Sequence, residues 1–297
     1  MVTHPRSLPR EISPSRHPLP IDLRGGWLAP LLLGMLALAP RLTTAQEVVS
    51  ASPDIQIAIG VAGLATADEA VAADNQLGIV LLENLGSLPG SADVVAFGLD
   101  LGGDRLFVLD TTAALAGGVT ASRGDVVRYD GASYSIEFDA SAAGVPAGSV
   151  ADAVSIAADG LLLSFDTTVA LPGLTVADED LVHWDGAVFS LALDGSAEGI
   201  DAAHDVDAAQ DLGGGAFLVS LDTMGTVGGI TAADEDVLRF DGSTWSLEFD
   251  ASGADADWAS ADLDAIQVPE PGGVALLVAG SVFLSLAAQQ RARRGTL

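Results

Sequence analysis

The chain of 297 residues contains no cysteine and no lysine, and its formal net charge is −29. The absence of cysteine excludes disulfides and thiol chemistry, so packed apolar segments must stabilise the fold. Residues 46–268 hold 38 acidic residues against four arginines, a net charge of −34. Such a polyanionic surface argues against a nucleic-acid partner, because nucleic acids are bound by basic patches, and it favours cations.

The first 45 residues carry the pattern of a secretory signal peptide. Four arginines precede an apolar run at residues 27–40, and the small residues at 43–45 offer a cleavage site. The apolar run of about 14 residues is short for a bilayer span. We therefore assign residues 1–45 to export, with an uncleaved N-terminal anchor as the alternative.

The body of the chain, residues 46–268, repeats itself. An apolar run that ends in aspartate occurs at residues 105–110, 161–166 and 217–222, so Asp110, Asp166 and Asp222 lie 56 residues apart. Self-similarity at a fixed period of this size is the signature of a repeat architecture. The repeat predicts three full units, at residues 93–139, 151–194 and 205–250.

Each full unit reads as four short strands. A glycine-containing break separates the first strand from the second, and an Asp-Gly turn at Asp130, Asp185 or Asp241 separates the third from the fourth. Asp-Gly is a strong hairpin signal because it tolerates the positive φ of a tight turn. The predicted strands are residues 93–100, 105–110, 125–130 and 134–139; 151–157, 161–166, 180–185 and 189–194; and 205–212, 216–222, 236–241 and 245–250.

The two ends of the body complement each other. Residues 54–84 align with a second, third and fourth strand but lack a first strand, whereas residues 261–268 resemble a first strand with no successors. Four-stranded units of this length build propellers, and a blade shared by both termini removes exposed edges. We therefore predict an all-β fold, a four-bladed β-propeller in which residues 261–268 pair with residues 54–61. A β-sandwich or an open β-solenoid is the alternative.

Three features follow one another after the body: a Pro-Glu-Pro motif, an apolar segment and an arginine cluster. They comprise Val268, Pro269, Glu270 and Pro271; residues 272–288; and Arg291, Arg293 and Arg294. The apolar segment is near the lower length limit of a transmembrane helix, and the positive-inside bias would keep the arginines cytoplasmic. The order of these parts in residues 269–297 resembles the PEP-CTERM sorting signal of exported bacterial proteins.

The resemblance concerns the tail and not the body. It implies a Gram-negative bacterium, transient anchoring in the inner membrane, and cleavage near the motif by an exosortase-type sorting enzyme. It also implies a mature protein at the cell surface or outside the cell, in contact with extracellular polysaccharide. A plain C-terminal anchor is the alternative.

Two acidic turns before predicted third strands are the candidate metal ligands. Grouped carboxylates suit Ca²⁺, which takes six to eight oxygen ligands. The spacing of an EF-hand loop is absent, and aspartates that cap backbone N–H groups in turns would produce the same pattern. The candidate Ca²⁺ ligands are Asp178, Glu179, Asp180, Asp234, Glu235 and Asp236; no other cofactor is expected.

The sequence contains no P-loop, nucleophile-elbow or zinc-ligand spacing. His183 occupies the position of Arg128 and Arg239 in the other units, so we expect a strand residue with an exposed ring. His204 lies in a loop without a counterpart in the other units, and Trp258 is expected to be exposed. Aromatic residues that recur at fixed places in the units predict packing between blades.

The favoured interpretation is a non-enzymatic cell-surface or extracellular-matrix protein. One alternative is a Ca²⁺-dependent adhesive or glycan-binding module. Another is a hydrolase of extracellular polymer that uses two carboxylates, as glycosidases do. Asp201 and Asp257, which occur in one unit only, are the residues to suspect for that activity.

Overall fold

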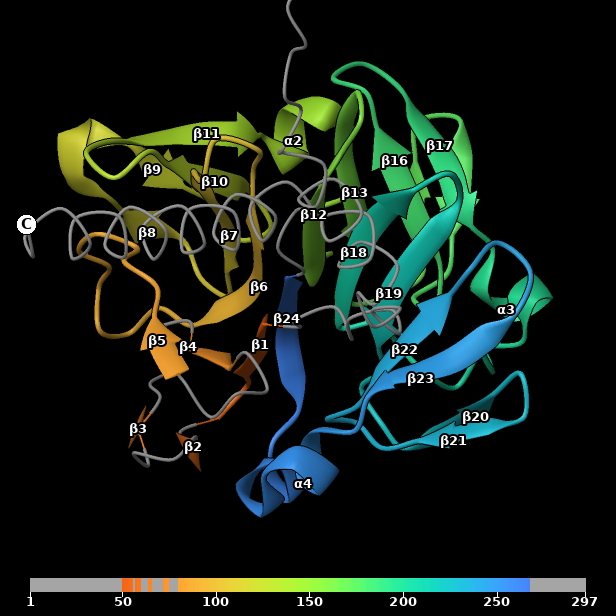
Figure 1. Cartoon of the computed structure of the whole chain (residues 1–297). Coiled ribbons are helices and arrows are strands. Elements are labelled where there is room, and N and C mark those ends of the chain that lie inside the picture. The colour runs from red at the N-terminus through yellow and green to blue at the C-terminus, as the bar shows by residue number, and fades with distance from the viewer. Residues whose placement is uncertain (1–49, 56, 60–63, 66–71, 75–79, 268–297) are drawn as a thin grey trace, which may run out of the picture. The chain divides into compact units, whose positions relative to one another are not determined.

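A computed structural model describes residues 50–55, 57–59, 64–65, 72–74 and 80–267 (Figure 1). All of them belong to one compact unit of the chain, residues 46–297. The predicted signal peptide, the sorting motif and the apolar segment of the tail lie outside the described residues. Among the described residues, no helix combines the length and the apolar character that a bilayer span requires.

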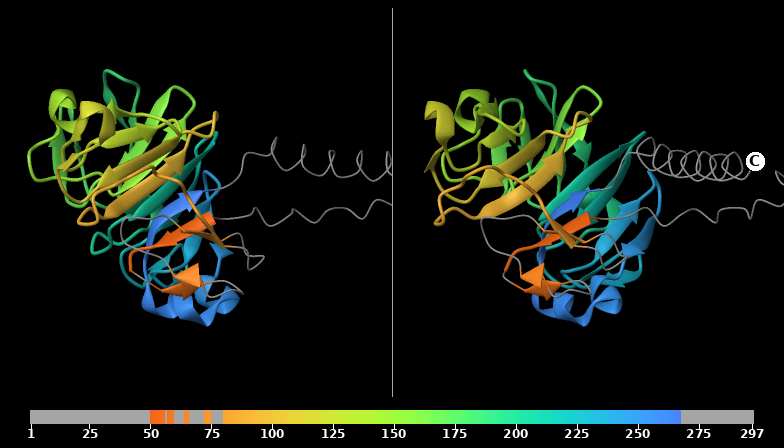
Figure 2. Two further views of the ribbon diagram at one scale, coloured as in Figure 1. Left: turned by 90° about the vertical axis from the view of Figure 1, so that its left-hand side faces the viewer. Right: turned by 60° about the vertical axis from the view of Figure 1, so that its left-hand side comes forward.

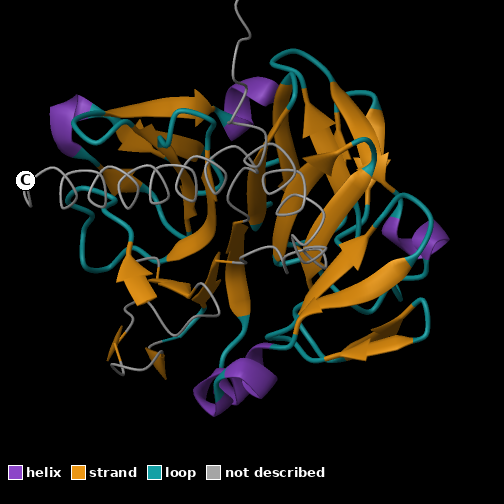
Figure 3. Cartoon of the chain, viewed as in Figure 1, coloured by secondary structure: helices purple, strands orange, loops and turns teal. Residues whose placement is uncertain are grey.

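The described chain is all-β, with helices only as short turns (Figure 3). Each full unit forms four antiparallel strands in the predicted order, the first beside the second, the second beside the third and the third beside the fourth. The strands are β6 (Val94–Leu99), β7 (Arg105–Leu109), β10 (Val126–Tyr129) and β11 (Tyr134–Phe138); β12 (Ala153–Ala157), β13 (Gly160–Ser164), β16 (Leu181–Trp184) and β17 (Phe189–Leu193); β18 (Ala208–Gly213), β19 (Ala216–Ser220), β22 (Val237–Phe240) and β23 (Trp245–Phe249).

The Asp-Gly turns between the third and fourth strands form as predicted. Asp130 Oδ1 accepts hydrogen bonds from the backbone N–H groups of Ala132 and Ser133, both at 2.8 Å. The glycine that follows has a φ of 90° at Gly131 and 93° at Gly186. Glycine is required there because other residues reach positive φ only at a cost.

Each unit also contains two elements that were not predicted from the sequence. A small hairpin connects the second and third strands of each unit, and a single helical turn follows the fourth strand. The hairpins are β8 (Ala113–Ala114) with β9 (Thr120–Ala121), β14 (Val169–Leu171) with β15 (Leu174–Val176), and β20 (Gly225–Val227) with β21 (Ile230–Ala232). The helical turns are α2 (Ala140–Ala143), α3 (Gly195–Glu198) and α4 (Ala251–Ala254), each with an aspartate side chain as its N-cap.

The first strands of the units lie side by side with β24 (Leu263–Gln267) (Figure 1). β6 contacts β12, β12 contacts β18, and β18 contacts β24. β24 in turn pairs in parallel with β6 through Ala265 and Phe97. These four inner strands therefore form a closed ring of neighbours.

The core lies between successive units. The ring of Phe138 in the first unit packs edge-on against Trp184 and Phe189 in the second, with centroids 5.7 and 6.2 Å apart. The indole N–H of Trp245 in the third unit donates to the carbonyl of Glu198 in the second at 2.8 Å. The recurring aromatic residues thus pack between units, as the sequence predicts.

The two ends of the body meet, but in a different register from the prediction. β24 pairs with β1 (Ser50–Pro53), and Ala51 lies opposite Ile266. Figure 2 shows β1 and β24 side by side in both views. The predicted partner, residues 54–61, was wrong: Asp54 directly follows β1, just as Asp110, 56 residues later, directly follows β7.

The remaining N-terminal strands follow from this register. β2 (Ala58–Ile59) pairs with β3 (Leu64–Ala65), which makes these two strands the counterpart of the small hairpin β8–β9 rather than part of a second strand. β4 (Ala72–Asp74) pairs with β5 (Val80–Leu82), inside the predicted third and fourth strands. We call the set formed by β24, β1, β4 and β5 the terminal unit.

Candidate functional site

An aspartate at the end of each second strand holds the start of a first strand. Its backbone N–H donates to a carbonyl there, and its side chain accepts a backbone N–H from the same residue. The four pairs are Asp110 with Asp93, Asp166 with Val150, Asp222 with Asp205, and Asp54 with Asp262. We call each of these pairs of hydrogen bonds a clamp. The clamped residues Asp93, Val150, Asp205 and Asp262 occupy equivalent positions around the ring. Two residues further along the chain, the equivalent positions hold Val95, Asp152, Asp207 and Asp264.

Carboxylates at these positions converge where the inner strands begin. One oxygen each of Asp152, Asp205 and Asp207 lies within 4.8 Å of the others. Asp207 also shares a side-chain hydrogen bond with Asp262, on the first strand of the terminal unit. The carboxylates of Asp262 and Asp264 repel each other electrostatically. We call these five residues the central carboxylate cluster.

The environment of the central carboxylate cluster disfavours negative charge. Burial raises the pKa of Asp152 and Asp264 well above the usual range, and the neighbouring carboxylates Asp205 and Asp54 add to the effect. Burial also raises the pKa of Asp207, with Asp262 as the next contributor. The fold therefore brings like charges together in a place where water solvates them poorly.

Part of this cluster has no hydrogen-bond partner. Asp152 is 8% exposed, and neither of its carboxylate oxygens accepts a hydrogen bond. Oδ1 of Asp205 is also buried without a hydrogen-bond partner. A buried and unpaired carboxylate is costly. The arginines of the described chain pair with other acids: Arg105 with Glu83, Arg123 with Asp166, Arg128 with Asp100, Asp104 and Glu137, and Arg239 with Glu248. Such a cluster is stabilised either by bound protons or by a cation.

The six predicted Ca²⁺ ligands do not come together in this way. Both carboxylate oxygens of Asp180 accept hydrogen bonds from backbone N–H groups, from Ala177 N at 2.9 Å and from Gly195 N at 2.9 Å. Asp236 makes the same two contacts in the third unit. The two acidic turns are thus local caps in separate units, which is the alternative that turn chemistry offers. Among the described residues, the group of potential metal ligands within 4.8 Å is the one at Asp152, Asp205 and Asp207.

The other members of the two turns add to the acidic surroundings. Glu179 and Glu235 are buried, and burial raises the pKa of each. Asp178 and Asp234 add to the negative potential at Asp205 and Asp262 respectively. They therefore extend the acidic region around the central carboxylate cluster. The spacing Asp-X-Asp at residues 205–207 and again at 262–264 was the signal in the sequence for the site itself.

His183 lies on the third strand of its unit, opposite Leu162, as Arg128 lies opposite Leu106. Its ring is not exposed as expected: the side chain is 21% exposed, and Nε2 lies 2.9 Å from Asp159 Oδ1. The strand position was predicted correctly, but the approach of Asp159 to the ring is not visible in the sequence.

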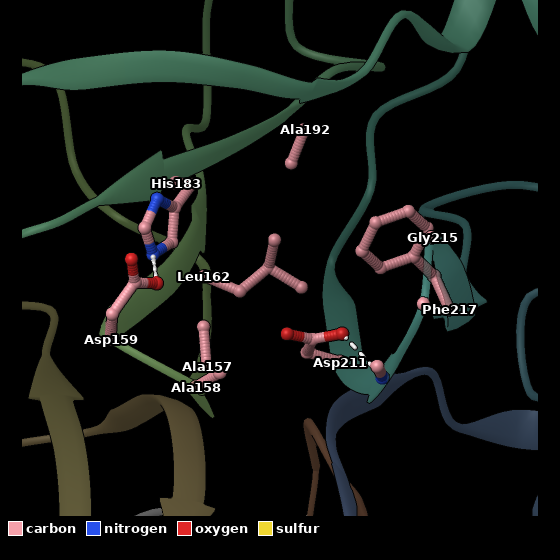
Figure 4. Close-up of a pocket in the computed structure, with 11 residues that line it drawn as sticks. Ala157, Ala158, Asp159, Leu162, His183, Ala192, Asp211, Gly215 and Phe217 are labelled. Carbon is pink, nitrogen blue, oxygen red and sulfur yellow. Dashed lines mark hydrogen bonds and ion pairs between the residues drawn. The ribbon is translucent and has the colours of Figure 1, made fainter.

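A hollow of about 260 Å³ lies beside His183, at the opposite end of β12 and β18 from the central carboxylate cluster (Figure 4). Asp211 and Phe217 of the third unit line its other side. The small side chain of Ala192 leaves room here. The other units have Glu137 and Glu248 at the corresponding position, and each of these glutamates pairs with an arginine.

The remaining candidates have structural roles or stand alone. His204 Nδ1 lies 2.9 Å from Thr223 Oγ1, and its backbone N–H donates to the carbonyl of Asp201 in a turn. Asp257 is exposed on η2 (Ala256–Ser260). Trp258 was expected to be exposed but is 0% exposed, in the core between the third unit and β24. The sequence could not show this burial, because the residue lies outside the repeat pattern.

Comparison with known proteins gives little to add. No protein-family model matches the chain. No curated protein matches it either. A solved structure titled "YCF48 bound to D1 peptide" aligns with 68% of this chain and 68% of its own, at 7% identity and a TM-score of 0.27.

Proposed function

We propose that this protein is an exported, non-enzymatic cell-surface or extracellular-matrix protein of a Gram-negative bacterium, sorted through a PEP-CTERM/exosortase-type system. Its body is a four-bladed β-propeller, with the terminal unit as the fourth blade. Its partners are the sorting enzyme, the inner membrane before processing, and extracellular polysaccharide afterwards.

The ring of inner strands supports the propeller. A sandwich would pack two sheets face to face, and an open solenoid would leave its first and last units without a common neighbour. Here β24 contacts both β18 and β6, and it pairs with β1 from the other end of the body. The strand β24 is thus paired on both sides and presents no open edge on which another chain could add.

The observation that carries the function is the tail of three parts and its place after the body. β24 ends at Gln267, and the motif begins at the next residue, Val268. A cut near Pro269-Glu270-Pro271 would therefore release the body with every described strand intact. The net charge of −34 in residues 46–268 suits a protein that must remain soluble among other surface components.

The test is to replace Pro269, Glu270 and Pro271 by alanine and to follow the protein through cell fractions. We expect export to proceed and the variant to stay in the inner membrane, because the sorting enzyme no longer recognises it. Leu101→Ala, at a body residue that is 78% exposed, is the control and should be sorted like the wild type. Normal processing and release of the triple variant would contradict the proposal.

A further inference from the structure

We propose that Asp152, Asp205 and Asp207 of the central carboxylate cluster bind a hard divalent cation, Ca²⁺, at the start of the inner strands. This site differs from the acidic turns at residues 178–180 and 234–236. It goes beyond the proposed sorting and surface function and does not depend on it.

The geometry of the oxygens fits one ion. Ca²⁺ lies about 2.3–2.6 Å from its oxygen ligands, so two oxygens that share it are at most about 5 Å apart. One oxygen of each of the three aspartates meets this condition, since all three lie within 4.8 Å of one another. Ca²⁺ also tolerates irregular ligand geometry, whereas Mg²⁺ requires a near-ideal octahedron.

The carboxylate of Asp152 is buried without a hydrogen-bond partner. At 8% exposure its two oxygens lack hydrogen-bond partners. The aspartates of the clamps, such as Asp166 and Asp222, each accept a backbone N–H at 2.8 Å. Buried polar groups in native proteins nearly always have a partner, so an exception requires an explanation. A cation between Asp152 and Asp205 supplies that partner.

The repeat itself does not require carboxylates at these places. Val95 occupies in the first unit the position of Asp152, and Val150 occupies in the second unit the position of Asp205. An apolar residue therefore suits the start of an inner strand equally well. The aspartates are present although burial and mutual repulsion disfavour them, which indicates a ligand rather than a folding role.

The site would connect parts of the ring. Asp152 precedes β12 and Asp207 precedes β18, so a shared ion joins the second and third units. Asp207 contacts Asp262, which precedes β24 of the terminal unit. Bound Ca²⁺ should therefore stabilise the closed ring as a whole and raise the melting temperature of the body.

The experiment compares thermal unfolding and calorimetric titration of the full chain in detergent, first with chelator and then with Ca²⁺ alone. For the wild type we expect heat of binding and a saturable rise in melting temperature, with a Kd of about 10⁻⁴–10⁻³ M, the weak end of the range of protein Ca²⁺ sites. Asp152→Asn should melt higher than the wild type in chelator, because the electrostatic repulsion between Asp152 and Asp205 is removed. Its affinity for Ca²⁺ should fall at least about tenfold, since one charged ligand is lost.

Two further variants distinguish Ca²⁺ binding at the central carboxylate cluster from a non-specific effect of the negative charge of the protein. Asp152→Val introduces the residue of the first unit and should abolish the response to Ca²⁺ while the protein remains folded. Asp257→Asn removes an exposed carboxylate on η2 and should respond like the wild type. The proposal is overturned if Ca²⁺ gives neither heat nor a shift in melting temperature. It is also overturned if Mg²⁺ and Ca²⁺ shift the wild type and the Asp152 variants equally, which is the result of charge screening alone.

Discussion

Asp54 and Asp262, separated by 208 residues in the sequence, exchange two hydrogen bonds. Asp54 N donates to the carbonyl oxygen of Asp262 at 3.0 Å, and Asp262 N donates to Asp54 Oδ1 at 2.8 Å. The same pair of bonds joins Asp222 and Asp205, which are 17 residues apart. A contact that is local in a full unit thus becomes, in the terminal unit, the connection between the two ends of the body.

Removing the Asp54 side chain should destabilise the body as much as removing its counterpart. Asp54→Ala leaves the N–H of Asp262 without its acceptor, at a cost of about 1–3 kcal/mol in the free energy of unfolding. Asp110→Ala breaks the equivalent bond to Asp93 and should cost a similar amount. Urea unfolding measures both, with Asp257→Ala as an exposed control. An Asp54 variant as stable as this control would show that the ends are not held together by this contact.

The strand β24 should be essential, although it lies next to the tail. A chain that ends at Ser260 loses Leu263 and Ile266, which are 0% and 1% exposed. Leu263→Ala alone should lower the free energy of unfolding by about 2–5 kcal/mol, because it leaves a cavity in the core. Leu247→Ala, at a residue that is 40% exposed, is the matched control. Melting of the truncated chain within a degree or two of the intact one would refute this role.

The Asp180 side chain should stabilise its unit and make no contribution to Ca²⁺ binding. Asp180→Ala removes the acceptor of two backbone N–H groups, at Ala177 and Gly195, and should cost about 1–3 kcal/mol. Glu198→Ala changes an exposed carboxylate of the same unit and should cost less than about 0.5 kcal/mol. Urea unfolding with and without Ca²⁺ tests both statements. A loss of Ca²⁺ affinity in the folded Asp180 variant would indicate that the acidic turn at residues 178–180 binds the ion.

Trp258 should be one of the most important side chains of the core. It is fully buried beside Leu263 and Phe249, so Trp258→Ala should cost about 3–5 kcal/mol. Its burial also predicts protection from aqueous fluorescence quenchers. Met224→Ala, at a residue that is 69% exposed, should change the free energy of unfolding by less than about 0.5 kcal/mol. Equal effects of the two substitutions would contradict this place in the core.

The Asp241 carboxylate should contribute to the acid sensitivity of the fold. Hydrogen bonds from the backbone of Thr244 and the side chain of Ser243 lower its pKa to about 2. The unfolded chain titrates near 3.9, so the ionised group stabilises the fold above about pH 4 and loses this effect as the pH falls toward 2. Asp241→Asn does not titrate. Its free energy of unfolding should therefore depend less on pH between about 2 and 4 than that of the wild type, as urea unfolding at a series of pH values would show. An unchanged slope would contradict the low pKa.

The units, their strands and their Asp-Gly turns could be predicted from the amino-acid sequence. Strand pairs such as β10 with β11 are adjacent in the chain and joined by an Asp-Gly turn, so local chemistry specifies them. The period of 56 residues also predicts Asp54 as the equivalent of Asp110. This equivalence was missed because residues 54–84 have low similarity to the full units. The apolar run that begins at Ile55 resembled a second strand, whereas the clamp on Asp262 assigns that role to Ser50–Pro53.

The grouping of the acidic residues, in contrast, depends on contacts between units. Asp152, Asp205 and Asp207 belong to two units, and their distance depends on how the inner strands pack side by side. Asp180 and Asp236 looked equally suitable as ligands, yet local turns occupy their oxygens. The burial of Trp258 likewise depends on β24 lying against the third unit. Hairpins follow from neighbouring residues, but burial and carboxylate clusters arise from contacts between distant parts of the chain, which no local pattern encodes.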